Sequence, residues 1–236
     1  MSGRKHKTFA KSKEFNSVDT EVEEEIIAAY AKVALEDEDP SLKDLQEIFR
    51  ILQIPKCFTD DISESIEYYY EYLGDHGWEL DYLNIKQSTV LDLIRVYTIT
   101  SQIQTASDVI DILDIDKLIK NLNILVKFRN SYGHILDSWS LLVHSATSSR
   151  DNTEEFIVAY RLTLPDLKLI KTALNLDQDR ESGKSLGDSF LIDMLSCGST
   201  DFKGNRINFS LRTPKTGPCI TIKEFAEILG NLGEIG

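Results

Sequence analysis

Two stretches of this chain carry the residues of half a calcium-binding loop. Each reads apolar, Thr, apolar, any residue, acid, apolar, and they are residues 162–167 (LTLPDL) and 220–225 (ITIKEF). In a twelve-residue calcium loop, an apolar residue at position 8 pairs with a second loop. The carboxylate at position 12 binds the ion with both oxygens, and a helix leaves from it. The chemistry suggested by the pattern is therefore calcium binding by paired loops.

The oxygen ligands of the first half of each loop are missing. A working loop needs them at positions 1, 3 and 5, with a glycine at position 6. The residues at positions 1, 3 and 5 are Thr213, Lys215 and Gly217 before Glu224, and Glu155, Ile157 and Ala159 before Asp166. A single carboxylate stands among these six residues. We expect neither loop to bind calcium at signalling concentrations.

Two further copies of the pattern lie earlier in the chain. The first ends at Asp44 and has Pro40 at its turn, and the other, residues 113–118, has Lys117 at position 12. That lysine would place an ammonium group where the ion should sit. The apolar residues one, four and eight places after each acid repeat along the chain: Leu45, Ile48 and Leu52; Leu167, Ile170 and Leu174; Phe225, Ile228 and Leu232. Such a stripe also occurs in ordinary core helices, but the shared entry residues favour repeated helix–loop–helix units without a metal.

Other candidate sites are weaker. Residues 177–188 carry acids at positions 1, 3, 5 and 12, but Gly183 is one place late and Lys184 replaces the apolar pairing residue. Residues 182–185 (SGKS) resemble the end of a phosphate-binding loop, but Gln178 stands where its first glycine belongs. The histidines show no ligand spacing with the cysteines. We expect no enzyme activity and no cofactor.

Composition favours a folded acidic body that binds protein. The chain has 236 residues and a net charge of −13, and residues 1–13 hold five basic residues and no acid. The remaining, more acidic part should repel duplex DNA and suit a basic partner. Three widely spaced cysteines imply free thiols and no disulfide framework. No apolar run is long enough for a membrane span, and the N-terminus lacks a secretory signal.

Helical periodicity dominates, so the sequence predicts an all-α fold. Helices are expected over residues 21–33, 42–52, 62–73, 90–99, 113–128 and 135–146. The predicted organisation has three parts. They are a disordered basic tail (1–19), an N-terminal lobe (20–146) with an acidic tyrosine-rich insertion (60–100), and a C-terminal lobe (155–236).

Several short motifs carry a family resemblance. They are VEEEII at 22–27, Tyr30-Ala31, Trp139-Ser140, LSC at 195–197 and LGNLG at 229–233. Over roughly residues 20–236 the chain resembles the centrin branch of the calmodulin superfamily, and more closely the Rad33 family of yeast nucleotide-excision-repair proteins. Residues 60–100 and 199–218 look expanded relative to that family.

This resemblance implies a fold and a function. The fold would be a calmodulin- or centrin-like, two-lobed arrangement of degenerate EF-hands. The protein would be a nuclear, non-catalytic subunit of the damage-recognition complex. It would bind and stabilise the yeast homologue of xeroderma pigmentosum group C protein (Rad4) by enclosing an amphipathic helix in a groove. By position the groove would be lined by Leu167, Ile170, Leu174, Phe190, Met194, Phe225, Ile228 and Leu232, each of which could equally be plain core.

Two alternatives stay open at the level of sequence. One is a calcium-regulated, centrin-type cytoskeletal protein, which requires at least one loop that binds the ion. The other is an acidic adaptor in transcription or chromatin that docks through residues 59–82, a stretch with eight acids and no Lys or Arg.

Overall fold

The structure, a computed structural model, confirms the expectation of a mainly helical protein. It describes residues 12–34, 39–76, 85–100, 109–147, 153–174, 187–198, 208–209 and 217–235. None of the helices in these ranges is both long and apolar enough to cross a bilayer. The candidate loop at 177–188 lies almost wholly outside the described residues.

The N-terminal part of the fold is a group of helices around one apolar core. Its elements are α1 (Lys13–Asn16), α2 (Thr20–Val33), the 3-10 turn η1 (Leu42–Asp44), α3 (Leu45–Ile51), the 3-10 turn η2 (Lys56–Phe58), α4 (Asp60–His76), α5 (Ile85–Tyr97) and α6 (Ile115–Asn130). Helix α4 continues through Gly74, which the sequence predicted as its end. A glycine inside a helix is tolerated at a cost of about 1 kcal/mol.

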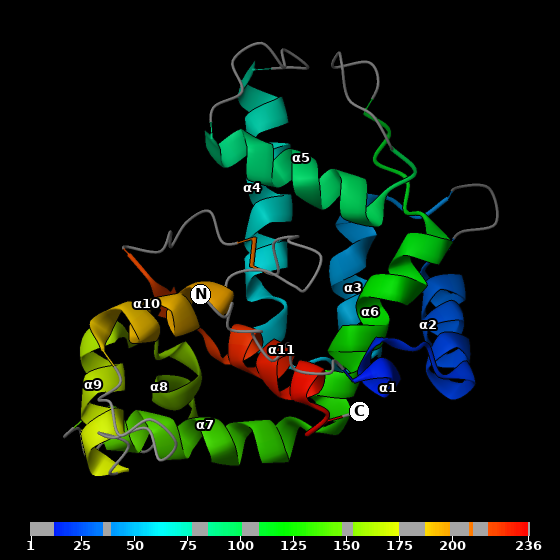
Figure 1. Ribbon diagram of the computed structural model, residues 1–236. Helices are drawn as coiled ribbons and strands as arrows, with labels where there is room; N and C mark the ends of the chain where they lie inside the picture. Colours follow the sequence, from blue (N-terminus) through cyan, green and yellow to red (C-terminus); the bar gives the residue numbers. More distant parts are fainter. Residues whose placement is uncertain are drawn as a thin grey trace, which may run out of the picture.

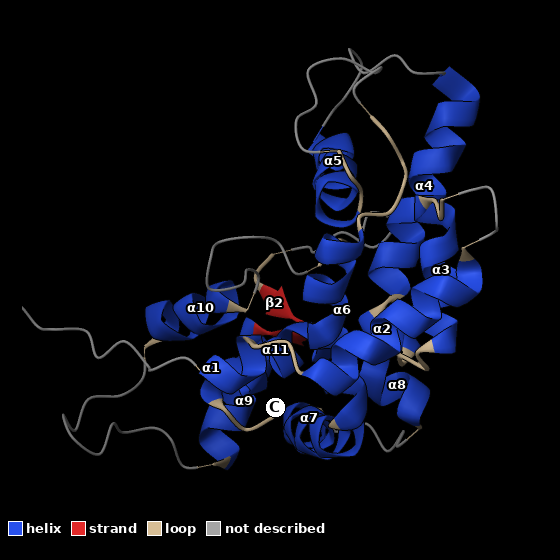
Figure 2. Cartoon of the chain, turned by 90° about the vertical axis from the view of Figure 1, so that its right-hand side faces the viewer, coloured by secondary structure: helices blue, strands red, loops and turns tan. Residues whose placement is uncertain are grey.

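The C-terminal part is built on a short antiparallel strand pair. Its elements are α7 (Tyr132–Ala146), α8 (Glu154–Ala159), β1 (Leu162–Thr163), α9 (Leu164–Ala173), α10 (Asp188–Cys197), β2 (Cys219–Ile220) and α11 (Ile222–Leu232). Figure 1 shows α11 in the middle of the molecule, between α7 and the group formed by α4 and α6. Figure 2 places β2 next to α11. The two parts of the chain are therefore in contact through α11.

The core runs without a break through both parts, and its buried residues come from α1 to α11. Helices α2 and α6 pack along each other. Arg129 of α6 donates to Glu25 of α2 (Nη2 to Oε2, 2.9 Å) and to the carbonyl of Leu52 (2.7 Å). The hydrogen bond from Arg129 holds the pKa of the Glu25 carboxyl below its usual range, against the opposing effect of burial. This ion pair fixes α2 and the end of α3 on α6.

The structure differs from the disordered tail predicted for residues 1–19. From residue 12 the chain is packed, and α1 inserts Phe15 into the core with none of its surface exposed. Composition alone gave the prediction of disorder, because two isolated phenylalanines in a polar stretch carry no periodic signal. Residues 1–11 lie outside the described residues. The lobe boundaries stay a prediction.

A buried ion pair joins α4 to α11. Lys223 and Asp61 are 6% and 9% exposed, and the lysine Nζ lies 2.8 Å from both carboxylate oxygens. Asp61 also accepts the Phe209 N–H (2.7 Å), and Ser65 donates to the Phe209 carbonyl. The Lys223 ammonium lies 6.0 Å from the centroid of the Phe209 ring. One turn of α4 thus binds both Phe209 and the start of α11.

We predict that Lys223→Met destabilises the protein by roughly 3–5 kcal/mol, because it leaves the Asp61 carboxylate buried without a counter-charge. Urea unfolding measures the change. The double variant Asp61→Leu/Lys223→Met should recover most of the loss, since it removes both charges. Glu47→Gln, in an exposed pair with Arg50, is the control and should change nothing measurable. Equal stability of Lys223→Met and the wild type would contradict the assignment.

Candidate functional site

The two stretches that opened the sequence analysis lie side by side. Strands β1 and β2 are antiparallel, with Leu162 opposite Ile220 and Thr163 opposite Cys219. Leu162 and Ile220 are the two residues at position 8, so these stretches meet at the position through which calcium-binding loops pair. The contact joins apolar side chains and main-chain groups.

The acid at position 12 acts as a helix cap in each of three copies. In all three it accepts hydrogen bonds from the N–H and the hydroxyl of the residue three places before it, forming a capping box. The N–H bond is 2.8 Å in every copy, and the pairs are Ser41 with Asp44, Thr163 with Asp166, and Thr221 with Glu224. These carboxylates stabilise the starts of η1, α9 and α11.

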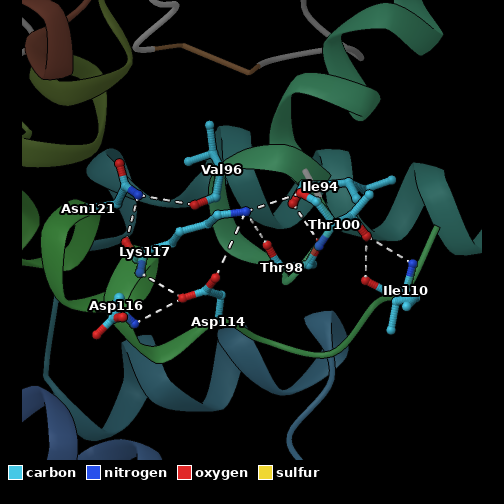
Figure 3. A network of polar contacts seen from close by, with 9 residues as sticks. All are labelled: Ile94, Val96, Thr98, Thr100, Ile110, Asp114, Asp116, Lys117 and Asn121. Carbon is cyan, nitrogen blue, oxygen red and sulfur yellow. Dashed lines mark hydrogen bonds and ion pairs between the residues drawn. The ribbon is translucent and has the colours of Figure 1, made fainter. Parts of the chain in front are cut away.

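In the fourth copy a lysine ammonium lies among loop oxygens. Lys117 Nζ donates to the carbonyls of Thr98 (2.6 Å) and Thr100 (3.1 Å) and lies 4.0 Å from Asp114 Oδ2 (Figure 3). Asp114 caps α6 through its other oxygen, which accepts the Asp116 and Lys117 N–H groups. We call this arrangement the Lys117 site. The positive charge in this site is the ammonium group of a side chain of the protein.

The same loop is closed by further hydrogen bonds (Figure 3). The Thr100 hydroxyl donates to the Ile110 carbonyl (2.8 Å) and accepts the Ile110 N–H (2.9 Å). Asn121 of α6 donates to the carbonyl of Val96 at the end of α5 (3.1 Å). Across the described ranges, no group of three or more His, Cys, Asp or Glu side chains is arranged to hold a metal ion.

The eight predicted partner-binding residues divide by exposure. Ile170 is buried, and Leu167, Phe225 and Ile228 are half-buried. The other four are about half exposed: Leu174 (53%), Phe190 (49%), Met194 (47%) and Leu232 (49%). Leu174 is the C-cap residue of α9, and Phe190 and Met194 belong to α10. These two helices pack together. We call these three residues the outer apolar set.

Trp139 of α7 packs against Phe225, one of the inner four. It is fully buried, its ring centroid lies 5.4 Å from that of Phe225, and its indole N–H donates to the Ile157 carbonyl (2.8 Å). Helix α7 packs against both α9 and α11. The inner face of these helices is therefore occupied within the chain, and the outer set faces solvent.

Sequence reasoning missed two exposed apolar residues of the same helices, Leu169 (55%) and Ile192 (37%). They lie off the stripe that faces the core. The signal was present in α10, where Phe190, Leu191, Ile192 and Met194 make the apolar face wider than the stripe that is buried at Leu191 and Leu195.

Two tyrosines of α4, Tyr69 and Tyr70, take part in packing. Tyr69 is 6% exposed, and the Tyr70 hydroxyl donates to Asp111 (2.7 Å) while the Lys43 ammonium lies 4.4 Å from the Tyr70 ring centroid. Burial, followed by the Asp111 carboxylate, raises the pKa of Tyr70. Trp78 and Tyr82 of the acidic tyrosine-rich segment lie outside the described residues.

The described cysteines have the character of inert thiols. Cys219 is buried in β2, and Cys57 is half-buried with its pKa raised to about 12, chiefly by burial. A thiol with so high a pKa stays protonated at neutral pH and is a poor nucleophile.

The structure thus defines a class: a mainly helical protein with paired, capped loops and no described metal cluster. Comparison with protein-family models matches residues 12–179 to the Rad33 family. The chain belongs to the Rad33 family, which indicates a role related to DNA repair. No curated protein sequence and no solved structure gives a significant match.

We predict that Lys117→Met weakens the Lys117 site, because the carbonyls of Thr98 and Thr100 lose a charged donor. The loss should be roughly 1–3 kcal/mol in unfolding free energy, with faster hydrogen exchange at the Ile110 amide. Lys120→Met is the control, since Lys120 is exposed on the same helix. If the two variants unfold alike, Lys117 does not hold the loop.

Proposed function

We propose that this protein is a nuclear, non-catalytic subunit of the nucleotide-excision-repair damage-recognition complex. In this proposal it binds and stabilises the yeast homologue of xeroderma pigmentosum group C protein (Rad4). The contact is an amphipathic helix of the partner against the apolar surface of α9 and α10. Membership of the Rad33 family supports the repair setting.

The exposed outer apolar set is the observation that carries the partner site. A Phe, a Met and a Leu, each about half exposed, gather on one pair of packed helices. Scattered apolar residues are common on surfaces, but neighbouring ones mark binding sites. Methionine and phenylalanine suit a helix-in-groove contact, because both adapt to an apolar partner face.

Charge supports a basic amphipathic helix as the partner. The chain carries a net charge of −13, and α10 itself holds Asp188 and Asp193 beside the outer set. Lys168 of α9 pairs with Asp188 of α10 at 2.7 Å. The exposed Asp193 of α10 is then the carboxylate that would bind a basic side chain of the partner. Complementary charge would orient the partner and raise its association rate.

We further propose that the helices form degenerate EF-hands in two pairs. The β1–β2 contact supports one pair. A similar contact supports the other, since Ser41 bridges Ile112 and the Leu113 N–H donates to the Pro40 carbonyl (2.8 Å). Pro40 and Leu113 are the position-8 residues of the first and fourth copies. Each copy therefore meets another at the position that pairs calcium loops.

Binding would proceed without calcium. The position-12 carboxylates serve as helix caps, and the Lys117 ammonium supplies a charge inside its loop. No ion is then needed to shape the loops, and no ion-driven opening exposes the outer set. The energy of association comes from burial of apolar surface, at about 25 cal/mol per Å².

We predict that Phe190→Asp and Met194→Asp each weaken binding to the recombinant partner at least roughly ten-fold, since a charge replaces an apolar contact. Isothermal titration calorimetry measures the affinity. Leu141→Asp is the matched control, because Leu141 is 70% exposed and belongs to α7, which contributes no residue to the outer set. Unchanged affinity in both α10 variants, with normal helicity, would exclude this surface.

We predict equal affinity for the partner in excess calcium and in excess chelator. The same titration, repeated in the two buffers, measures it. A calcium-dependent affinity would favour the calcium-regulated alternative and contradict the proposal. Loss of binding on replacing the described tyrosines of α4, with the outer set intact, would instead favour the acidic adaptor.

A further inference from the structure

Residues 12–17 lie as a short helical turn between α6 and α11. Phe15, at the centre of the turn, is fully buried, and its ring centroid lies 6.0 Å from that of Phe128 on α6. The Ser12 N–H donates to the Asn231 carbonyl at the end of α11 (3.1 Å). Figure 1 shows α1 beside α6, close to the C-terminal end of α11.

Helix α11 leaves room for the Phe15 ring at Gly230. A Cβ atom at this position would lie 2.2 Å from the ring, too close for any side chain. A glycine inside a helix costs about 1 kcal/mol relative to alanine. The shape of α11 is therefore matched to this one aromatic side chain.

Helix α6 binds the main chain of the same turn. The Lys127 side chain is 3% exposed, and its ammonium lies 2.6 Å from the Glu14 carbonyl and 2.9 Å from the Ser17 carbonyl. Asn123 donates to the Ser17 carbonyl as well (2.9 Å). The Glu14 carbonyl also accepts the Ser17 N–H (3.2 Å) and the Ser17 hydroxyl (2.8 Å). The ammonium therefore adds a charged donor at the C-terminal end of the turn, where a positive charge is favourable.

The site therefore binds one aromatic side chain and a set of main-chain groups. It also keeps spare acceptors, because the side-chain oxygens of Asn123 and Asn231 are buried without a partner. Beyond the turn, Val18 is 39% exposed and Asp19 reaches the ammonium only at 3.5 Å. The turn is held by its own contacts and joined to α2 by an exposed connection.

We propose that the facing residues of α6 and α11 form a binding site for a Phe-centred helical turn, and that residues 12–17 fill it as an exchangeable intramolecular ligand. This site is separate from the outer apolar set on α9 and α10, and the proposal does not depend on the proposed function. Tethering gives the turn an effective concentration of about millimolar. The same sequence supplied as a free peptide competes poorly with it until the tethered copy loses its anchor.

The test uses the full chain and a fluorescently labelled peptide of residues 10–20. Fluorescence anisotropy should show the peptide binding the Phe15→Ala chain at least about ten-fold more tightly than the wild-type chain. Val18→Ala is the control chain and should behave as the wild type. A peptide with Phe15→Ala should bind no chain. Equal binding to all chains, or no binding to a folded Phe15→Ala chain, overturns the proposal.

A measurement on the wild type covers the case in which Phe15→Ala fails to fold. Native-state hydrogen exchange reports the opening of the turn through the Ser17 amide, which donates to the Lys13 carbonyl (3.0 Å). An exchangeable ligand opens locally, so this amide should exchange at least roughly 100-fold faster than the α6 amides. Equal protection of Ser17 and α6 would make the turn part of the cooperative core and overturn the proposal.

Discussion

Lysine ammonium groups hold main-chain carbonyls and carboxylates together at three junctions of this fold. Lys117 closes the loop between α5 and α6, Lys127 binds the end of α1, and Lys223 joins α11 to α4. An ammonium has three N–H donors and no acceptor, so it can serve several oxygens at once. Burial of such a charge is costly unless its partners are complete. The positions of α1, α4, α5 and α11 all depend on these contacts.

Groups of the protein itself also make the contacts at the starts of the helices. The acids of the capping boxes need only the N–H and the hydroxyl of a neighbouring Ser or Thr. The strand pair needs only Leu162, Ile220 and their main chains. In the loop between α5 and α6 the positive charge is part of the protein, because Lys117 Nζ donates to the carbonyls of Thr98 and Thr100.

Much of this could be predicted from local sequence. The helices follow the apolar periodicity, the strand pair follows the two position-8 residues, and the Lys117 site follows from a lysine at position 12. These features depend on neighbours within a few residues or on a repeated pattern. The ion pair of Lys223 with Asp61 joins residues 162 positions apart, and no local sequence pattern predicts it. Phe15 was likewise assigned to a polar tail. The space for its ring exists because Gly230, far away in the sequence, has no side chain. The packing of Trp139 against Phe225 depends on the course of α7, which periodicity does not give.

Gly230 also constrains the order in which the chain can fold. The ring of Phe15 finds α6 once residue 128 has been synthesised, but the other wall of its site is absent until residue 230 has followed. During translation α1 therefore cannot complete its contacts until α11 has been synthesised. Contacts of such large sequence separation slow folding and leave apolar surface uncovered in the meantime. A nascent chain of this protein exposes Phe15 for longer than any local helix would require.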